Sequence, residues 1–187
     1  MQQSAHVALI AGASVLAACA DPSRVTQPTS TEPSLARASA STRPVIMFDA
    51  CDPATFDAAL GAGTCLRSGG MSFSQFIEQL TRHQDVGAWH FAPPTMNVPE
   101  GATLLATNRG GEVHTFTEVD EFGGGIVPLL NELSGTPDVA QECAALSAGD
   151  FVPPGGTFTV AEEETGVELY QCCIHPWMRT TVRVRER

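Results

Sequence analysis

One stretch near the C-terminus carries three side chains that bind soft metal ions. The sequence from Cys172 to Met178 reads CCIHPWM, so a thiolate, an imidazole and a thioether lie within seven residues. A fourth ligand must come from elsewhere, and we expect His114, which opens a β-prone segment after a polar turn. Two histidines, one cysteine and a weak axial methionine form the ligand set of a type 1 copper site. A zinc site or a metal-free domain is the alternative that these residue types leave open.

The chemistry of such a ligand set is electron transfer. A trigonal plane of two imidazoles and one thiolate suits both Cu(II) and Cu(I), so little reorganisation accompanies the gain or loss of one electron. Because protein side chains supply all four ligands, no position stays open for a substrate. We therefore expect one type 1 copper ion in a one-electron carrier, and not an enzyme.

These ligands must be positioned by short strands. Runs of β-prone residues broken by Pro, Gly and Asn predict strands near 89–91, 102–107, 114–119, 157–160, 167–172 and 180–185. In the last run Val182 and Val184 alternate with Arg183 and Arg185, so the valines should face the core. Many short strands without long intervening helices favour an all-β antiparallel sandwich or barrel. Residues 122–149 form a long insertion between strands.

Residues 45–86 are expected to form a small helical extension before these strands. The first helix has Asp52 as its N-cap, Pro53 at the first helical position and Gly61 just beyond its end. The second runs from about Phe73 to His83, where apolar residues spaced by three and four share one face. That apolar face must pack on something larger, which we expect to be the sandwich.

The N-terminus is typical of an exported chain. Residues 1–18 contain a twelve-residue apolar run, the size of a signal-peptide core and too short to span a membrane. The run ends in Leu16-Ala17-Ala18-Cys19, which resembles the lipobox of bacterial lipoproteins, although no Lys or Arg precedes it. Residues 19–44 would then be a lipidated Cys19 and a tether rich in Ser, Thr and Pro. These features predict a domain in the periplasm or extracellular space, anchored to a bacterial membrane through the N-terminal lipid only.

The charge balance limits the partners. The formal net charge is −11, which makes nucleic acid a poor partner and favours a basic one. For an electron carrier, we expect a redox protein such as a basic cytochrome.

The region from about residue 88 to the C-terminus resembles a known family, the cupredoxins. The segment from Tyr170 to Arg179, followed by Val182 and Val184, is similar to the last strand pair of the plastocyanin and amicyanin branch, with its Cys-x-x-His-Pro-x-Met loop. Upstream matches are Val98-Pro99-Glu100-Gly101, then Leu104, Leu105 and Asn108, and Pro153-Pro154-Gly155-Gly156 before Phe158. The resemblance implies a Greek-key β-sandwich over residues 87–187 and copper ligands at His114, Cys172, His175 and Met178.

Two further expectations come from this family. Its spacing selects Cys172 rather than Cys173 as the ligand, and strand parity agrees, because neighbouring side chains point to opposite faces. The histidine of the cysteine loop has an exposed edge in the family, so His175, with Pro176 and Trp177, would form a docking rim. Thr115 stands where the family usually has an asparagine that braces the ligand loops.

The remaining cysteines suggest disulfides. With Cys19 assigned to lipid and Cys172 to metal, four of the six cysteines remain, an even number in an oxidising compartment. Three pairings are possible. We favour Cys51 with Cys65, around the first helix, which leaves Cys143 to pair with Cys173.

Two other functions compete with the electron carrier. A copper-handling or copper-sensing lipoprotein would use the same ligands to hold or pass on the metal. A metal-free interaction module on the same scaffold would need none of them.

Overall fold

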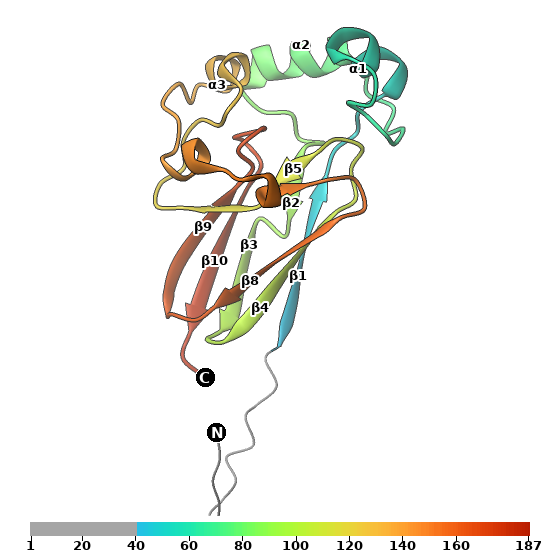
Figure 1. Cartoon of the computed structure of the whole chain (residues 1–187). Coiled ribbons are helices and arrows are strands. Elements are labelled where there is room, and N and C mark those ends of the chain that lie inside the picture. The colour runs from blue at the N-terminus through green and yellow to red at the C-terminus, as the bar shows by residue number, and fades with distance from the viewer. Residues whose placement is uncertain (1–40) are drawn as a thin grey trace, which may run out of the picture. The chain divides into compact units, whose positions relative to one another are not determined.

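The computed structural model describes residues 41–187 (Figure 1). The predicted signal peptide, the lipidated Cys19 and most of the tether lie outside the described residues. The strands are β1 (Thr42–Phe48), β2 (His90–Ala92), β3 (Thr95–Pro99), β4 (Ala102–Asn108), β5 (His114–Thr115), β6 (Thr117–Val119), β7 (Phe151–Val152), β8 (Thr157–Glu162), β9 (Gly166–Gln171) and β10 (Arg179–Arg185). The helices are α1 (Pro53–Leu60), α2 (Phe73–His83) and α3 (Pro128–Leu133), with short 3-10 turns at η1 (Glu142–Ala145) and η2 (Ala148–Asp150).

The strands form a β-sandwich, which confirms the predicted fold class. One sheet has the order β2-β1-β4-β8, the other has the order β3-β10-β9-β6, and β5 and β7 form a small separate ladder. The side chains between the sheets make the main core, in which the rings of Phe116 and Tyr170 stack with centroids 4.5 Å apart. Val182 and Val184 are buried while Arg183 and Arg185 are exposed, as their alternation predicts.

The sheets are mixed rather than purely antiparallel. β1 runs parallel to β4, with Thr42 opposite Thr103, and β3 runs parallel to β10, with Thr95 opposite Thr181. Parallel neighbours need a long crossover connection. The chain between β1 and β4 supplies one, since it carries both cap helices and two strands.

The first described residues differ from the helical extension that the sequence predicts. Residues 45–86 were expected to lie outside the sandwich, but β1 is a strand of the first sheet. Val45 and Met47 are fully buried and their neighbours are less so, which is the alternation of a strand with one face in the core. The run is too short, and too close to the polar tether, for this alternation to stand out in the sequence.

Both expected helices are present with the predicted bounds. The Asp52 side chain accepts a hydrogen bond from the Thr55 amide at 3.1 Å, and Gly61 follows the last turn of α1 with φ of 113°. Ser72 and Gln75 form a reciprocal capping box at the start of α2. Within residues 41–187 no helix has the length and apolar character needed to cross a bilayer.

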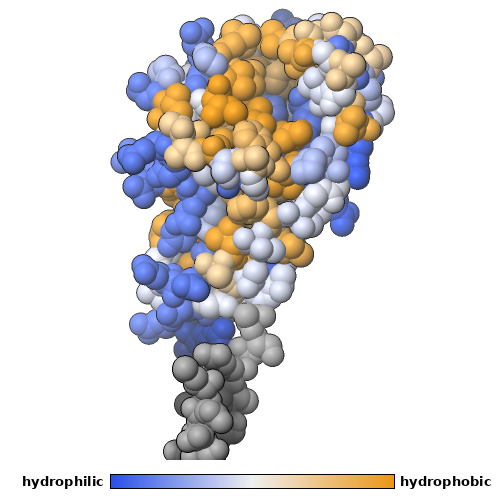
Figure 2. Space-filling view, viewed as in Figure 1, coloured by the Kyte–Doolittle hydropathy of each residue, from blue (hydrophilic) through white to orange (hydrophobic). Residues whose placement is uncertain are grey.

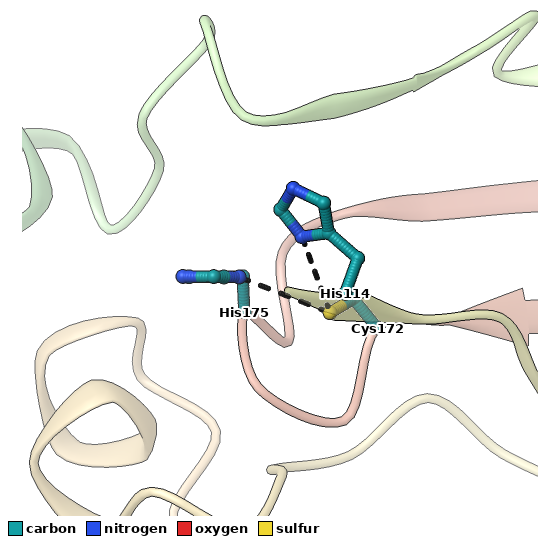
Figure 3. A group of neighbouring side chains, drawn as sticks. All are labelled: His114, Cys172 and His175. Carbon is teal, nitrogen blue, oxygen red and sulfur yellow. Dashed lines mark hydrogen bonds between the residues drawn. The ribbon is translucent and has the colours of Figure 1, made fainter. Parts of the chain in front are cut away.

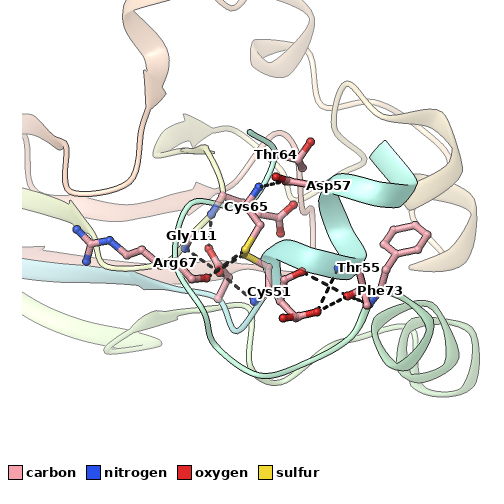
Figure 4. Close-up of a disulfide and its surroundings, with 12 residues drawn as sticks. Cys51, Thr55, Asp57, Thr64, Cys65, Arg67, Phe73 and Gly111 are labelled. Carbon is pink, nitrogen blue, oxygen red and sulfur yellow. Dashed lines mark hydrogen bonds between the residues drawn. A yellow bond between two sulfur atoms is a disulfide. The ribbon is translucent and has the colours of Figure 1, made fainter. Parts of the chain in front are cut away.

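The three helices lie together across one end of the sandwich (Figure 1). We call α1, α2 and the segment between them the cap. The cap is fastened by the Cys51–Cys65 disulfide and by two hydrogen bonds, from the Cys65 amide to Asp57 and from the Phe73 amide to Thr55 (Figure 4). α3 belongs to the insertion at 122–149.

A second disulfide joins Cys143 of the insertion to Cys173, so both favoured pairings are confirmed.

Candidate metal centre

Three of the four predicted ligands converge at the capped end of the sandwich (Figure 3). Cys172 directly follows β9, His114 opens β5, and His175 lies in the loop from 172 to 178 that leads into β10. The Nδ1 atoms of both histidines lie 3.8 Å from the sulfur of Cys172, and the candidate ligand atoms of all three residues lie within 4.8 Å of one another. The three side chains are almost completely buried, with 3% exposure for His175 and none for the other two.

The loop that carries these ligands is closed by its own backbone. The pairing of β9 with β10 ends at Gln171 and Arg179, and the chain between them turns back tightly. The Cys172 amide donates to the Met178 carbonyl at 3.0 Å, and the Met178 amide donates to the His175 carbonyl at 2.9 Å. Met178, the predicted axial ligand, is fully buried in the main core. Its backbone is thus bonded to two of the three converging residues.

Thr115 braces the cysteine pair. Its amide donates to the Cys172 sulfur at 3.4 Å, and its hydroxyl accepts from the Cys173 amide at 2.8 Å. A threonine hydroxyl therefore connects the ligand loop to β5 at the position where the family usually has an asparagine.

Cys172 and Cys173 point to different cores, as strand parity predicts. Cys172 belongs to the main core and is the free cysteine of residues 41–187. Cys173 packs in a smaller core with Val119, Ala140 and its disulfide partner Cys143. The only thiol available to a metal at this site is therefore Cys172.

Asp49, which sequence reasoning missed, contacts the far side of His114. Its Oδ2 lies 2.9 Å from His114 Nε2, and its carboxylate also accepts the amides of Gly111 and Glu112 at 2.9 Å each. A carboxylate on the outer nitrogen of a ligating histidine fixes the ring and raises its basicity. Asp49 lies 65 residues from His114 in the sequence, and the only local signal is its place at the end of a β-prone run.

Glu112, which was also missed, occupies the equivalent place at His175. Its Oε2 lies 3.6 Å from His175 Nε2 and accepts the indole N–H of Trp89 at 2.7 Å. Glu112 is only 6% exposed. Both histidines therefore present Nδ1 to the cysteine sulfur and have a buried carboxylate beside Nε2.

The protonation equilibria follow from this arrangement. Burial alone would raise the pKa of the Cys172 thiol, but hydrogen bonds and charge from His114 and His175 hold it well below its usual range. Burial alone would lower the pKa of His114, but the bonds to Asp49 and Cys172 raise it to about 9. Burial raises the pKa of the Glu112 carboxyl. The cysteine is therefore poised as a thiolate.

The donor set fits a soft or borderline cation. A buried thiolate with two inward imidazole nitrogens has the chemistry that copper and zinc accept. Asp49, Cys51 and Glu112 also lie close together, but the Cys51 sulfur is held in a disulfide and cannot act as a thiolate ligand.

One expectation about this site is wrong: His175 has no exposed edge. Its ring makes an edge contact with Phe76 of α2, at 6.4 Å between centroids, and another with Trp177 at 5.5 Å. Pro176 is buried and Trp177 is partly buried. The cap covers the surface where the docking rim was expected.

Comparison with known proteins gives likenesses in structure alone. No protein-family model matches the chain, and no curated protein matches it. Among solved structures, a purple cupredoxin from Nitrosopumilus maritimus is 25% identical, over 55% of this chain and 90% of that one, with a TM-score of 0.40. A mutant of amicyanin in the Cu(I) form is 20% identical, over 51% of this chain and 73% of that one, with a TM-score of 0.35. The chain is thus similar, at low identity, to solved cupredoxins.

Proposed function

We propose that this chain is a type 1 copper protein that carries single electrons. His114, Cys172 and His175 would hold the ion in a trigonal plane, with Met178 as the axial ligand. The observation that carries the proposal is the convergence of both Nδ1 atoms on the thiol of Cys172, the free cysteine of residues 41–187, at 3.8 Å each. The sequence resemblance to the plastocyanin and amicyanin branch supports it.

The protein's own groups supply rigidity, charge and exclusion of water. A bound copper ion would supply the Cu(II)/Cu(I) couple. Thr115, Asp49 and Glu112 fix the sulfur and the two rings before metal arrives, so the same geometry serves both oxidation states. The two carboxylates add negative charge near the site, which favours the more highly charged Cu(II).

An absorption spectrum of the copper-loaded protein tests this function. We expect an intense visible band from thiolate-to-Cu(II) charge transfer, which Cys172→Ser abolishes. Cys173→Ser is the matched control and should keep the band, although it also breaks the disulfide to Cys143. Tight binding of zinc, with no visible band for copper, would contradict the proposal.

The axial ligand needs its own test. Met178→Leu should keep copper and raise the reduction potential, because the axial group tunes the redox balance without holding the ion tightly. An unchanged potential in voltammetry would mean that Met178 is not the axial ligand.

Copper storage or sensing is the second candidate, and the cap favours it. Only 3% of His175 is exposed, so a protein partner cannot approach that ring closely. A carrier should be reduced and reoxidised repeatedly without losing metal. A storage or transfer protein should instead release Cu(I) rapidly to a chelator.

The location and partner of this carrier complete the proposal. Lipidation at Cys19 would anchor the chain outside the cytoplasm, and mass spectrometry of the native N-terminus tests it. An acidic protein should meet a basic cytochrome faster at low salt, because screening acts over about 10 Å at 0.1 M ionic strength. Stopped-flow electron transfer across a salt series tests this, and a rate that does not fall with salt would contradict it.

A further inference from the structure

A tryptophan side chain links the cap to the candidate metal centre. The indole nitrogen of Trp89 donates to Glu112 Oε2 at 2.7 Å, and the same oxygen lies 3.6 Å from His175 Nε2. All three side chains are buried. One carboxylate oxygen is therefore shared between an indole and a predicted copper ligand, away from solvent.

The helices of the cap hold the indole in place. Its ring stacks on Phe56 of α1, with centroids 5.8 Å apart, and lies tilted against Phe76 of α2, at 4.8 Å. Both phenylalanines are almost fully buried. Figure 2 shows hydrophobic residues gathered around α2 and α3 on this end of the molecule. The indole is thus fixed by apolar contacts with two helices, and its one polar group meets Glu112.

Trp89 competes with His175 for the Glu112 carboxylate. Asp49 Oδ2 lies 2.9 Å from His114 Nε2, whereas the corresponding distance from Glu112 to His175 is 3.6 Å. The short bond to Glu112 comes instead from the indole, at 2.7 Å. A carboxylate at the outer nitrogen raises the basicity of a ligating histidine. The bond from Trp89 therefore limits this effect at His175.

We propose that Trp89 is a positioning residue, which holds the Glu112 carboxylate back from His175 and thereby raises the reduction potential of the copper site. The effect on the potential rests on the proposed function, but the hydrogen bond itself needs no metal. With the bond in place, less negative charge reaches the imidazole, and the more highly charged Cu(II) is stabilised less. Without it, the freed carboxylate bonds to His175 Nε2 and favours Cu(II).

Removal of the indole N–H alone tests the role of Trp89. Benzothienylalanine has sulfur in place of the N–H and keeps the two-ring shape, so it can replace tryptophan during expression. At pH 8 the ratio of Cu(II) to Cu(I) at a fixed applied potential should rise about tenfold, because a hydrogen bond to a charged acceptor is worth about that factor. For one electron this is a fall of about 59 mV in the reduction potential.

The second tryptophan provides a matched control. The chain has two tryptophans, and the Nε1 atom of Trp177 makes no hydrogen bond with residues 41–187. In a Trp177→Phe chain the replacement reaches Trp89 alone and should lower the potential as before. In a Trp89→Phe chain it reaches Trp177 alone and should leave the potential where that variant has it. The reverse pattern would overturn the proposal.

Glu112→Gln tests whether the effect passes through the carboxylate. Glutamine keeps an oxygen that can accept from Trp89 but carries no charge, so the same replacement in this variant should not lower the potential. A potential that stays constant or rises when the parent chain is altered would overturn the proposal. An equal fall in the parent chain and in Glu112→Gln would also overturn it.

NMR of the metal-free full chain gives a readout that does not depend on copper. Glu112→Gln should move the indole N–H signal of Trp89 and leave that of Trp177 in place, and benzothienylalanine should move the Nε2 signal of His175. If no variant shows the visible copper band, the proposed function fails while these signals still report the bond. Unmoved signals of Trp89 and His175 would overturn the role of Trp89 even if copper binds as proposed.

Discussion

A carboxylate lies beside the Nε2 atom of each histidine of the candidate centre, and the two carboxylates differ in the hydrogen bonds that they accept. Asp49 accepts from His114 at 2.9 Å and from two backbone amides, so its position is fixed. Glu112 lies farther from its histidine, at 3.6 Å, and its charge is opposed by burial. The two imidazoles are therefore not equivalent, and His114 is the more rigidly held.

Removing the charge of Asp49 should weaken the metal site. We expect Asp49→Asn to lower copper affinity by roughly 10- to 100-fold, since partners of ligating histidines typically contribute that much. A competition titration against a chelator measures this. Asp57→Asn is the matched control, because Asp57 also accepts backbone amides but lies on helix α1 of the cap and makes no contact with His114. Equal affinities in the two variants would show that Asp49 does not support His114.

The Thr115 hydroxyl should stabilise the fold by accepting hydrogen bonds from the Cys173 amide and the Thr117 hydroxyl. Thr115→Val keeps the shape but leaves the buried Cys173 amide without its acceptor, so we expect a loss of about 1–3 kcal/mol in the free energy of unfolding. Urea unfolding of the metal-free protein measures it. Thr115→Ser retains the hydroxyl, so its free energy of unfolding should fall clearly less than that of Thr115→Val. A valine variant as stable as the parent chain would contradict the bracing role.

At this scale the sequence predicts which side chains converge better than it predicts the groups that support them. The convergence of His114, Cys172 and His175 follows from residue types at a fixed spacing, whereas the role of Met178 as a ligand stays a prediction. The carboxylates come from segments that only the tertiary fold brings near, 65 residues away in the case of Asp49, and no local pattern marks them. The burial of His175 was missed for the same reason, because it depends on how the cap packs.

Among the elements, the insertion at 122–149 is attached closely to the ligand loop. The Ile126 amide donates to the Cys173 carbonyl at 2.7 Å, and Gln171 and Gly123 exchange hydrogen bonds at 3.0 and 3.3 Å. Asn131 closes the turn before α3 through two bonds to Gly125. Together with the disulfide, these contacts hold α3 beside the loop, where Leu130 and Ile174 line the same apolar cavity.

Removing the second disulfide tests how much this covalent bond contributes to the free energy of unfolding. Paired Cys143→Ala and Cys173→Ala changes open a loop with a sequence separation of 30 residues, and we expect a loss of about 3–4 kcal/mol in unfolding free energy. Thermal unfolding under non-reducing conditions measures it. Paired Cys51→Ala and Cys65→Ala changes, with a separation of 14, should cost slightly less. A larger loss of unfolding free energy on removing the Cys51–Cys65 disulfide would contradict this order. It would mean that strain in the folded state or residual structure in the unfolded state has a larger effect than loop length.

The sequence predicts well the elements that have capping residues at their ends or a clear alternation of apolar and charged residues. α1 and α2 have cap residues at both ends, and β10 alternates clearly between valine and arginine. β1 and β3 are short runs containing Pro44 and Pro99, and each pairs with a strand far along the chain. Parallel pairing of this kind depends on the path of the whole chain, which no local signal specifies.

On the scale of the whole molecule, negative charge gathers on a hollow away from the candidate centre. Glu118, Glu162, Glu163, Glu164 and Glu168 all line it. The Tyr170 hydroxyl donates to Glu162 at 2.8 Å and reaches Glu118 at 3.5 Å. Partial burial, followed by the neighbouring Glu168 and Glu162, raises the pKa of Glu118 to about 7.

This raised pKa makes stability depend on pH. The folded state favours protonated Glu118, so its favourable contribution is complete below about pH 4.5 and is lost as the pH rises through 7. Glu118→Gln mimics the protonated form. The variant should match the parent chain at pH 4 and exceed it at pH 8 by on the order of 1 kcal/mol, after allowance for solvent screening.

Chemical unfolding at both pH values measures this difference. Glu163→Gln removes one charge from an exposed residue of the same hollow and serves as the control. A stabilisation that is equal at pH 4 and pH 8 would contradict the assignment to Glu118.

The direction of β1 decides which end of the sandwich faces a surface to which the chain is attached at Thr42. The strand begins at Thr42, at the end of the sandwich remote from the helices, and runs about 20 Å before reaching Asp49 beside His114 (Figure 1). The C-terminus emerges at the same remote end as Thr42. A bead or electrode attached at Thr42 or at the C-terminus therefore meets the base of the sandwich, and the helical end faces outward into the surrounding solution.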